Sequence, residues 1–231
     1  MKSWVDYWNS DHAIYVSDRH KQLHAAAVGK DILRHVADPG AVVLDHGCGE
    51  ALYAEAVAAG CGHLILCEAA PTVREKLAAR VAANPAIEVV GAEDVARIED
   101  GSLDLVVANS LVQYLQREEL TGLLDLWRRK LKQTGSLVVA DVIPPDVSPI
   151  TDALALLRFG FQGGFVVAAF LGLAKTAVSD YRSIRARLGF SMYPEAEFLA
   201  LLGAHGFAGQ RVHPNFGHNQ ARMTFRATPT I

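Results

Sequence analysis

Short apolar runs alternate with helical patterns along most of this 231-residue chain, and this alternation restricts the possible fold more than any other feature. Five runs have the length and the Val, Ile and Leu content of buried strands: residues 41–45, 63–68, 87–91, 103–109 and 136–142. Helical periodicity separates them, at residues 50–60, 71–84 and 117–132. Continuous apolar strands that are joined by helices form parallel sheets with both faces covered. We therefore expect an α/β fold with a doubly wound, mostly parallel sheet.

The two ends of the chain add helices and the last strands. Residues 17–36 predict a helix with Ser17 or Asp18 as its cap, so we expect an N-terminal helical cap over residues 1–40. Residues 194–231 predict a C-terminal helix that opens at Pro194, then a strand, a turn and a last strand. The turn favours an antiparallel hairpin, which completes a sheet of seven strands.

Composition and charge indicate one globular domain whose main partner is not a nucleic acid. The chain is 51% hydrophobic and 20% charged, with a net charge of -3, and it shows no basic arm or face. Its three cysteines lack the paired spacing of a zinc site, so we interpret them as reduced thiols. Residues 1–12 lack the apolar core of a signal peptide. Together these features predict a cytoplasmic protein.

Residues 146–193 follow the fifth predicted strand and form an apolar, helical insertion. Within it, residues 159–174 are nearly all apolar, but they fall short of the roughly 20 residues that span a bilayer. We therefore expect a lid that closes over the acceptor side of a ligand site. The basic stretch that follows, residues 175–187, predicts a solvated helix and would also suit a membrane surface, so a lipid-facing role stays open as the alternative.

A glycine-rich turn, VLDHGCGEA, follows the first predicted strand and has the form of a dinucleotide-binding loop. Such a loop offers its glycines and a helix N-terminus to a pyrophosphate. Here Asp45 and Glu50 flank Gly47 and Gly49 and would repel a phosphate, and Leu52 replaces the third glycine of the dinucleotide motif. The two acids suit a cationic ligand instead. S-adenosylmethionine, with its ammonium and sulfonium groups, fits this turn.

A further acid, Glu68, ends the second predicted strand. In parallel sheets the ligand lies at the carboxyl ends of the strands, and an acid at this place meets the ribose hydroxyls. Because this holds for both nucleotide folds, Glu68 indicates a nucleoside ligand without choosing between S-adenosylmethionine and a nicotinamide dinucleotide.

Four sequence blocks together resemble a known family. VLDHGCGEA, LILCEAA, DGSLDLVVANSLVQYL and LKQTGSLVVADVIPP span about residues 42–145. In order and spacing they are similar to the class I S-adenosylmethionine-dependent methyltransferases. The resemblance implies a single methyltransferase domain over residues 1–231, a cofactor-binding core at residues 41–145 and S-adenosylmethionine as the cofactor.

By the same resemblance, particular residues are expected to contact this cofactor. The turn Gly47–Cys48–Gly49 would admit its methionine part, and Asp45 would orient its amino group. Glu68 would hold the ribose hydroxyls, and Ala69 would pack on the adenine.

The family also places contacts after the third and fourth strands. The acid that meets the adenine amino group is expected at Ala92, so the resemblance leaves this role to Glu93 or Asp94, with Asp94 preferred. Asn109, at the end of the fourth strand, and Gln113 would touch the methionine end.

Histidine and arginine residues point to functions on the N-terminal helix and in the last turn. His20 and His24 share one helix face at a spacing that can bind metal, but no third ligand is evident, so we expect no metal site. Arg19 is a candidate partner for the methionine carboxylate. His218 is a candidate general base for the acceptor, and the alternative is a hydrogen-bonded residue of the turn.

One absent motif constrains the acceptor. Residues 109–112, Asn-Ser-Leu-Val, differ from the Asn/Asp-Pro-Pro-aromatic motif that the family uses to methylate amide or base nitrogens. With the apolar insertion, this favours a small, partly apolar molecule that is methylated by in-line displacement. The alternatives are a lipid-directed enzyme at a membrane surface and a non-catalytic S-adenosylmethionine-binding module. Neither the acceptor atom nor the oligomeric state follows from the sequence.

Overall fold

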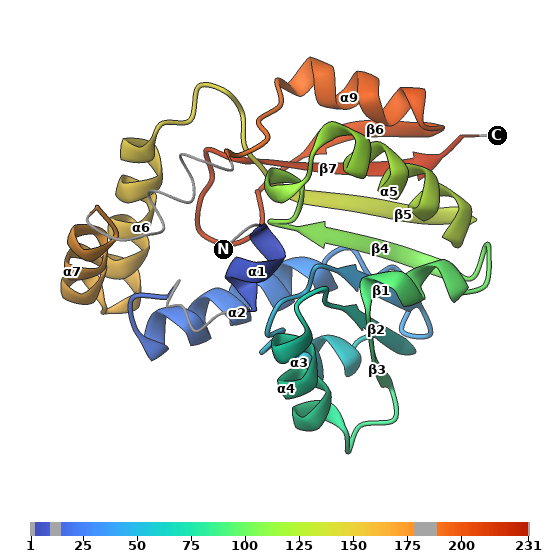
Figure 1. Cartoon of the computed structure of the whole chain (residues 1–231), viewed down its shortest axis with the longest axis horizontal. Helices are drawn as coiled ribbons and strands as arrows, with labels where there is room; N and C mark the ends of the chain where they lie inside the picture. Colours follow the sequence, from blue (N-terminus) through green and yellow to red (C-terminus); the bar gives the residue numbers. More distant parts are fainter. Residues whose placement is uncertain (1–2, 10–14, 178–188, 231) are drawn as a thin grey trace.

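The computed structural model describes residues 3–9, 15–177 and 189–230, and its centre is a twisted sheet (Figure 1). The strands are β1 (Val42–His46), β2 (His63–Cys67), β3 (Ile87–Val90), β4 (Leu103–Asn109), β5 (Leu131–Val142), β6 (Phe207–Val212) and β7 (Met223–Pro229). They lie in the order β3-β2-β1-β4-β5-β7-β6, and β7 is antiparallel to both of its neighbours. This seven-stranded, mostly parallel sheet with its C-terminal hairpin confirms the predicted fold class.

Helices surround the sheet. They are α1 (Trp4–Trp8), α2 (Asp18–Leu33), α3 (Ala54–Ala58), α4 (Pro71–Val81), α5 (Arg117–Lys130), α6 (Pro149–Gly163), α7 (Val166–Ala177) and α9 (Glu195–Ala204), with short 3-10 turns η1 (Ala92–Arg97) and η2 (Val112–Tyr114). Ser17, and not Asp18, caps α2, because its hydroxyl accepts a hydrogen bond from the backbone N–H of His20. The first helix α1 was not predicted; it begins with a capping box formed by Ser3 and Asp6.

Strand side chains alternate between two apolar cores, one on each face of the sheet. Val43 and Leu64 point to the face covered by α2, α3 and α4. Leu44 and Ile65, the next residues along the same strands, point to the face covered by α5 and α9. Trp127 of α5 is fully buried in this second core, where its indole N–H donates to Nδ1 of His46 at 3.0 Å. The continuous apolar strands follow from burial on both faces.

Two predicted boundaries were wrong, each for a local reason. The helix expected at residues 50–60 is only five residues long, because the glycine turn continues to Ala51, whose φ is 39°. Strand β5 begins at Leu131, five residues before its predicted start, because Leu131 pairs with Leu103 ahead of a register shift. The polar residues 132–134 of this extension have no strand-like pattern in the sequence.

The insertion forms two helices, α6 and α7, which lie together beyond the carboxyl ends of the strands (Figure 1). Gly164, at φ 73°, ends α6, and Phe165 is buried between the two helices and α2. Seven large apolar side chains of this pair are exposed: Ile150, Leu154, Phe161, Val166, Val167, Phe170 and Leu171. No helix in the described ranges is both long enough and apolar enough to cross a bilayer. Most of the predicted basic helix, residues 178–187, lies outside the described residues.

Candidate active site

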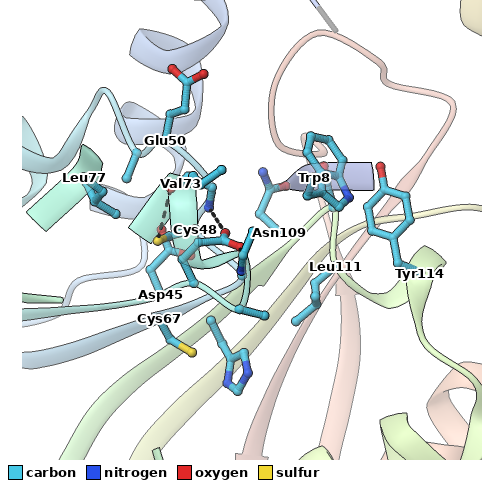
Figure 2. Close-up of a pocket in the computed structure, with 18 of the residues that line it drawn as sticks. Trp8, Asp45, Cys48, Glu50, Cys67, Val73, Leu77, Asn109, Leu111 and Tyr114 are labelled. Atoms are coloured by element: carbon cyan, nitrogen blue, oxygen red, sulfur yellow. Dashed lines mark hydrogen bonds between the residues drawn. The ribbon is translucent and has the colours of Figure 1, made fainter. Parts of the chain in front are cut away.

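A large cavity opens at the carboxyl ends of β1, β2 and β4, where the winding of the sheet reverses (Figure 2). Its volume is about 1900 Å³. Asp45 and Cys48 lie on one side of it, Trp8 and Tyr114 on the other, and Asn109 between them. The cavity therefore joins the glycine turn to residues from later parts of the chain.

The glycine turn is fixed by the end of the neighbouring strand. The backbone N–H groups of Gly47 and Cys48 donate to the carbonyl of Cys67 at 2.8 and 3.1 Å. Gly47 and Gly49 have φ values of 81° and 60°, which side chains other than hydrogen rarely allow. A Cβ atom on Gly47 would lie 2.9 Å from a methyl group of Leu111, whereas one on Gly49 would meet nothing within 4 Å. Gly47 is thus needed because Leu111 packs against it, whereas the space beside Gly49 is open to the cavity.

Asp45 lies beneath this turn, 1% exposed, at the end of β1. The hydroxyl of Tyr53 donates to its Oδ2. Burial raises the pKa of Asp45 to about 7, and the nearby Glu68 carboxylate adds to the increase, although the Tyr53 hydrogen bond opposes it. A buried carboxyl group with this pKa would ionise fully when a cationic group binds beside it.

Glu68 connects the glycine turn to the start of α4. Its Oε2 accepts from the N–H of Gly49 at 2.8 Å, and its Oε1 accepts from the N–H of Ala70 at 2.7 Å. Each carboxylate oxygen can accept two hydrogen bonds, so both oxygens keep capacity for a ligand hydroxyl. We name Asp45, Gly47, Cys48, Gly49 and Glu68 the acidic end of the cavity; all five line it.

The region after β3 contributes Ala92 to the cavity lining and no acid, and Ala69 lines the cavity after β2. Ala69 and Ala92 line the cavity, whereas Glu93 and Asp94 do not. The Asp94 carboxylate accepts from the N–H of Gly91 at 3.2 Å and from Arg97 at 2.6 Å, so it caps η1. Glu93 is exposed. The structure therefore places neither candidate acid on the cavity.

A second group of residues lining the cavity comes from three separate parts of the chain: α2, residues 109–113 and the residue before β7. We name it the polar wall: His24, Asn109, Ser110, Gln113 and Arg222. The amide oxygen of Asn109 is buried and has no hydrogen-bond partner in the described part of the chain. Orphaned buried oxygens of this kind are rare unless a ligand or water satisfies them.

The carboxyl ends of β4 and β5 are strained where they meet this wall. Ser110 and Asp141 have φ values of 54° and 63°, which are unfavourable for residues other than glycine. The Ser110 hydroxyl donates to Oδ2 of Asp141 at 2.8 Å, and the N–H of Asp141 donates to the side chain of Asn215 at 3.1 Å. Such strain persists only where surrounding contacts hold it, and it is frequent at ligand sites.

Arg222 is the centre of the polar wall. Its guanidinium donates to Asp141 at 2.6 Å, to Asp152 of α6 at 3.1 Å and to Gln113 at 3.3 Å. Sequence reasoning missed Ser110, Asp141 and Arg222. The position of Asp141 at the end of an apolar run was a usable signal, because it matches that of Asn109 at the end of β4. Nothing in the sequence near Arg222 connects it with either carboxylate.

Three histidines lie side by side at the edge of this wall. The rings of His20, His24 and His218 are 5.8 to 6.2 Å apart, centroid to centroid. His20 stacks on Phe165 and His218 stacks on Phe159, and burial lowers the pKa of both histidines to about 4. Only His24 of the three lines the cavity, so the structure sets the predicted base His218 behind it. Within the described residues, no cluster of His, Cys, Asp and Glu has the geometry of a metal site.

Arg19 and the insertion lie outside the cavity. The Nε of Arg19 donates to the carbonyl of Gly163 in α6, and Arg19 is absent from the cavity lining. No described residue of the insertion lines the cavity either. In this structure Arg19, the expected partner of the methionine carboxylate, therefore joins α2 to α6, and the described part of the expected lid packs on α2.

The unpredicted helix α1 partly covers the cavity. Asn9, which follows it, accepts a hydrogen bond from the N–H of Thr72 at 2.7 Å, at the start of α4. On its other side, Trp4 and Trp8 pack on Tyr114 with ring centroids 4.8 and 5.5 Å apart. This short segment thus connects the start of α4 to the aromatic side chain of Tyr114 across the cavity.

These features fit a cationic nucleoside. The acidic end presents two buried carboxyl groups and an open turn, Asn109 offers an unpaired oxygen, and Ala69 and Ala92 leave a flat apolar surface for a base. A pyrophosphate would face the carboxyl groups of Asp45 and Glu68 at this end.

Comparisons with known proteins agree with this geometry. Residues 44–139 match the family model of a methyltransferase domain. No curated protein matches the chain in sequence. Similar solved structures include a chain from the complex of the Haloferax volcanii Trm112 methyltransferase activator with its methyltransferase partner, which is 12% identical over 100% of both chains with a TM-score of 0.65.

Two further structures have the same fold. Magnesium protoporphyrin IX methyltransferase from Synechocystis PCC 6803, with S-adenosylhomocysteine bound, is 16% identical over 98% of this chain and 93% of that chain, with a TM-score of 0.61. The YcgJ protein from Bacillus subtilis is 15% identical over 82% of this chain and 71% of that chain, with a TM-score of 0.58. At such identities the shared feature is the fold.

Proposed function

We propose that the chain, which contains a methyltransferase domain, is a class I S-adenosylmethionine-dependent methyltransferase and that it methylates a small, partly apolar molecule. The bound cofactor supplies a methyl group on a sulfonium. In this proposal Asp45 orients the cofactor's ammonium, Glu68 accepts from its ribose hydroxyls, and Ala69 and Ala92 contact its adenine. These residues place and desolvate the cofactor, so that an acceptor on the polar wall can approach the methyl group in line.

The observation that carries this proposal is the single cavity shared by the acidic end and the polar wall. Pockets for one drug-sized ligand have volumes of roughly 300–1,000 Å³. A volume of about 1900 Å³ leaves space for a second molecule beside the cofactor. The wall that faces this space mixes apolar groups, such as Leu111 and Tyr114, with polar ones, which supports a partly apolar acceptor.

We also propose that the protein acts in the cytoplasm. The three cysteines are free and buried, which supports a reducing compartment. The exposed apolar face of α6 and α7 supports one alternative, a lipid-directed methyltransferase at a membrane surface. A non-catalytic S-adenosylmethionine-binding module is the other alternative, and the same experiment separates all three.

The experiment measures S-adenosylhomocysteine release from S-adenosylmethionine across a panel of small hydroxyl, amine and thiol compounds and lipid vesicles. We expect turnover with a small compound of the panel and none that depends on vesicles. Turnover with vesicles alone would favour the lipid-directed alternative. Cofactor binding without turnover of any compound would favour the non-catalytic module.

A further inference from the structure

His24 of α2 has three properties that the cofactor-binding role leaves unexplained. It lines the cavity next to the polar wall, although α2 is mainly a covering helix of the sheet. Its Nδ1 is buried and has no hydrogen-bond partner among the described residues. Its ring is held by neighbouring rings of Tyr15, His20 and His218, at centroid distances of 5.8, 6.2 and 5.8 Å. Because this ring is held in place and lines the cavity, it can contact a ligand that binds there.

We propose that His24 accepts the proton of an aromatic hydroxyl group on the acceptor. This inference rests on the proposed function and narrows its substrate class to phenol-like molecules. His218, which sequence reasoning favoured, instead supports the His24 ring from behind.

The surroundings of His24 keep its ring neutral at physiological pH. Burial lowers its pKa below that of an ordinary histidine, against the opposing effect of the Asp141 and Asp31 carboxylates. The other titratable groups packed around it are Tyr15, His20 and His218, while Arg222 and Asp152 lie beyond His218. A neutral imidazole can accept a proton, whereas an imidazolium cannot.

The charges of the polar wall select against anionic acceptors. Arg222 is the cation of this wall, and it already contacts both Asp141 and Asp152. One guanidinium with two carboxylates leaves a negative balance, so a carboxylate or phosphate on the acceptor would find repulsion and no free partner. A hydroxyl group finds hydrogen-bond acceptors instead, in the imidazole of His24 and the side-chain amide of Asn109, which both line the cavity.

Two features favour an aromatic hydroxyl over an aliphatic one. Trp4, Trp8, Tyr15 and Tyr114 all line the cavity, and aromatic walls bind flat rings by stacking or edge contacts. A phenol also ionises near pH 10, as tyrosine does, and so gives up its proton to a weak base far more readily than an alkyl alcohol.

The transfer balances in charge and atoms. The acceptor oxygen forms a bond to the methyl carbon while its proton moves to the imidazole of His24. The electrons of the broken carbon–sulfur bond stay on sulfur, which leaves neutral S-adenosylhomocysteine. The positive charge that began on the sulfonium ends on the imidazolium of His24, which then releases its proton to water.

The experiment compares para-propylphenol with para-propylbenzoate, which share the propyl-substituted ring but carry a neutral hydroxyl and a carboxylate, respectively. S-adenosylmethionine affinity is first measured by calorimetry for the wild type, His24→Gln and the control His218→Gln. Methyl transfer to each probe follows. Separately, NMR of labelled histidine rings in the S-adenosylhomocysteine-loaded wild type records whether each probe shifts the His24 resonances.

We expect the phenol, and not the benzoate, to be methylated and to shift the His24 signals. His24→Gln should keep its cofactor affinity and lose about 100-fold or more in methylation, the usual contribution of a general base. His218→Gln should lose less than tenfold. The fold-loss of methylation in His24→Gln should also be smaller for more acidic phenols, because these lose their proton more readily without a base. A purely structural role of His24 would not produce that trend.

Three outcomes would overturn the inference: equal methylation of benzoate and phenol, wild-type rates in His24→Gln, or no response of the His24 ring to the phenol. The NMR arm uses the wild type and so holds even if His24→Gln does not fold. If the wild type did not bind S-adenosylmethionine at all, that result would instead refute the proposed function itself.

Discussion

The acidic end and the polar wall share one cavity but are built in different ways. The acidic end consists of two strand ends and the turns that follow them, held by backbone N–H groups that donate to the Cys67 carbonyl and to Glu68. The polar wall is held by side-chain charges, with Arg222 between Asp141 and Asp152. The backbone construction preserves one ligand geometry, whereas the side-chain construction can change with a few substitutions. We infer that the first end serves the common cofactor and that the second determines the acceptor.

The largest expected effect tests the polar wall. Arg222→Met removes the cation between two partly buried carboxylates and leaves both without a counter-charge. Breaking such a buried network costs about 3 kcal/mol in the free energy of unfolding. S-adenosylmethionine affinity should stay within about threefold of the wild type, because the acidic end is built separately. Chemical denaturation and calorimetry measure the two quantities.

A matched control exists for this substitution. Arg97 pairs with Asp94 at 2.6 Å, but its side chain is 81% exposed. Arg97→Met should therefore change the free energy of unfolding by no more than about 0.5 kcal/mol. Equal losses in the two variants would contradict a structural role for the buried network.

The next effect tests the acidic end. Glu68→Ala removes the acceptor of two backbone hydrogen bonds and, in the proposed function, of the bonds from the ribose hydroxyls. Charge-assisted hydrogen bonds contribute roughly 1.5–3 kcal/mol each, so the Kd for S-adenosylmethionine should rise roughly 10- to 100-fold. Glu68→Gln, which keeps one oxygen acceptor, should weaken binding less. Calorimetry measures all of these.

Glu93→Ala is the control for Glu68, because this acid is exposed and does not line the cavity. It should bind the cofactor as the wild type does. If Glu93→Ala weakened S-adenosylmethionine binding as much as Glu68→Ala does, Glu93 would be shown to contact the cofactor.

A smaller effect follows from the raised pKa of Asp45. Its carboxyl is protonated below about pH 7, and the cofactor's ammonium favours the ionised form, so binding must release a proton below that pH. The Kd for S-adenosylmethionine should be constant above pH 8 and should rise toward tenfold per unit as pH falls from 7 to about 5. Asp45→Asn should bind more weakly but without this pH dependence. A flat profile for the wild type would show that Asp45 is already ionised in the free protein.

The smallest effect concerns the exposed face of α6 and α7. Phe161 and Phe170 are 79% and 65% exposed, so the double substitution to Ser removes little buried surface. Stability and cofactor affinity should stay close to wild type, within about 0.5 kcal/mol for exposed sites. Sedimentation with anionic liposomes is the informative measurement. Binding by the wild type that disappears in the double variant would assign this face to a membrane surface.

The sequence predicted the acidic end more completely than the polar wall, and the construction of the two explains why. Asp45, Gly47 and Gly49 are neighbours in the chain, and Glu68 ends the next strand, so their spacing alone places them together. Residues 110, 141, 152 and 222 meet only after β4, β5, α6 and the hairpin have assembled. No local pattern records such meetings.

The same reasoning applies to the fold. Strand β4 was predicted at both ends, because the residues from Leu103 to Ala108 other than Asp104 are apolar and buried and the run is bounded by polar residues. The start of β5 was missed. Its first residue pairs with Leu103 at the amino end of β4, and the next residue, Lys132, is partly exposed and contacts Asp104. Sequence patterns report burial, and they fail where a strand continues into solvent.

The most direct test of the account is a calorimetric titration of S-adenosylmethionine and NAD into the wild type and Asp45→Ala. The account predicts one S-adenosylmethionine site per chain in the wild type, its loss or strong weakening in Asp45→Ala, and no detectable NAD binding, because Asp45 and Glu68 would repel the pyrophosphate. Binding of NAD to the wild type, or S-adenosylmethionine affinity that is unchanged in folded Asp45→Ala, would contradict the assignment of the acidic end as the cofactor site.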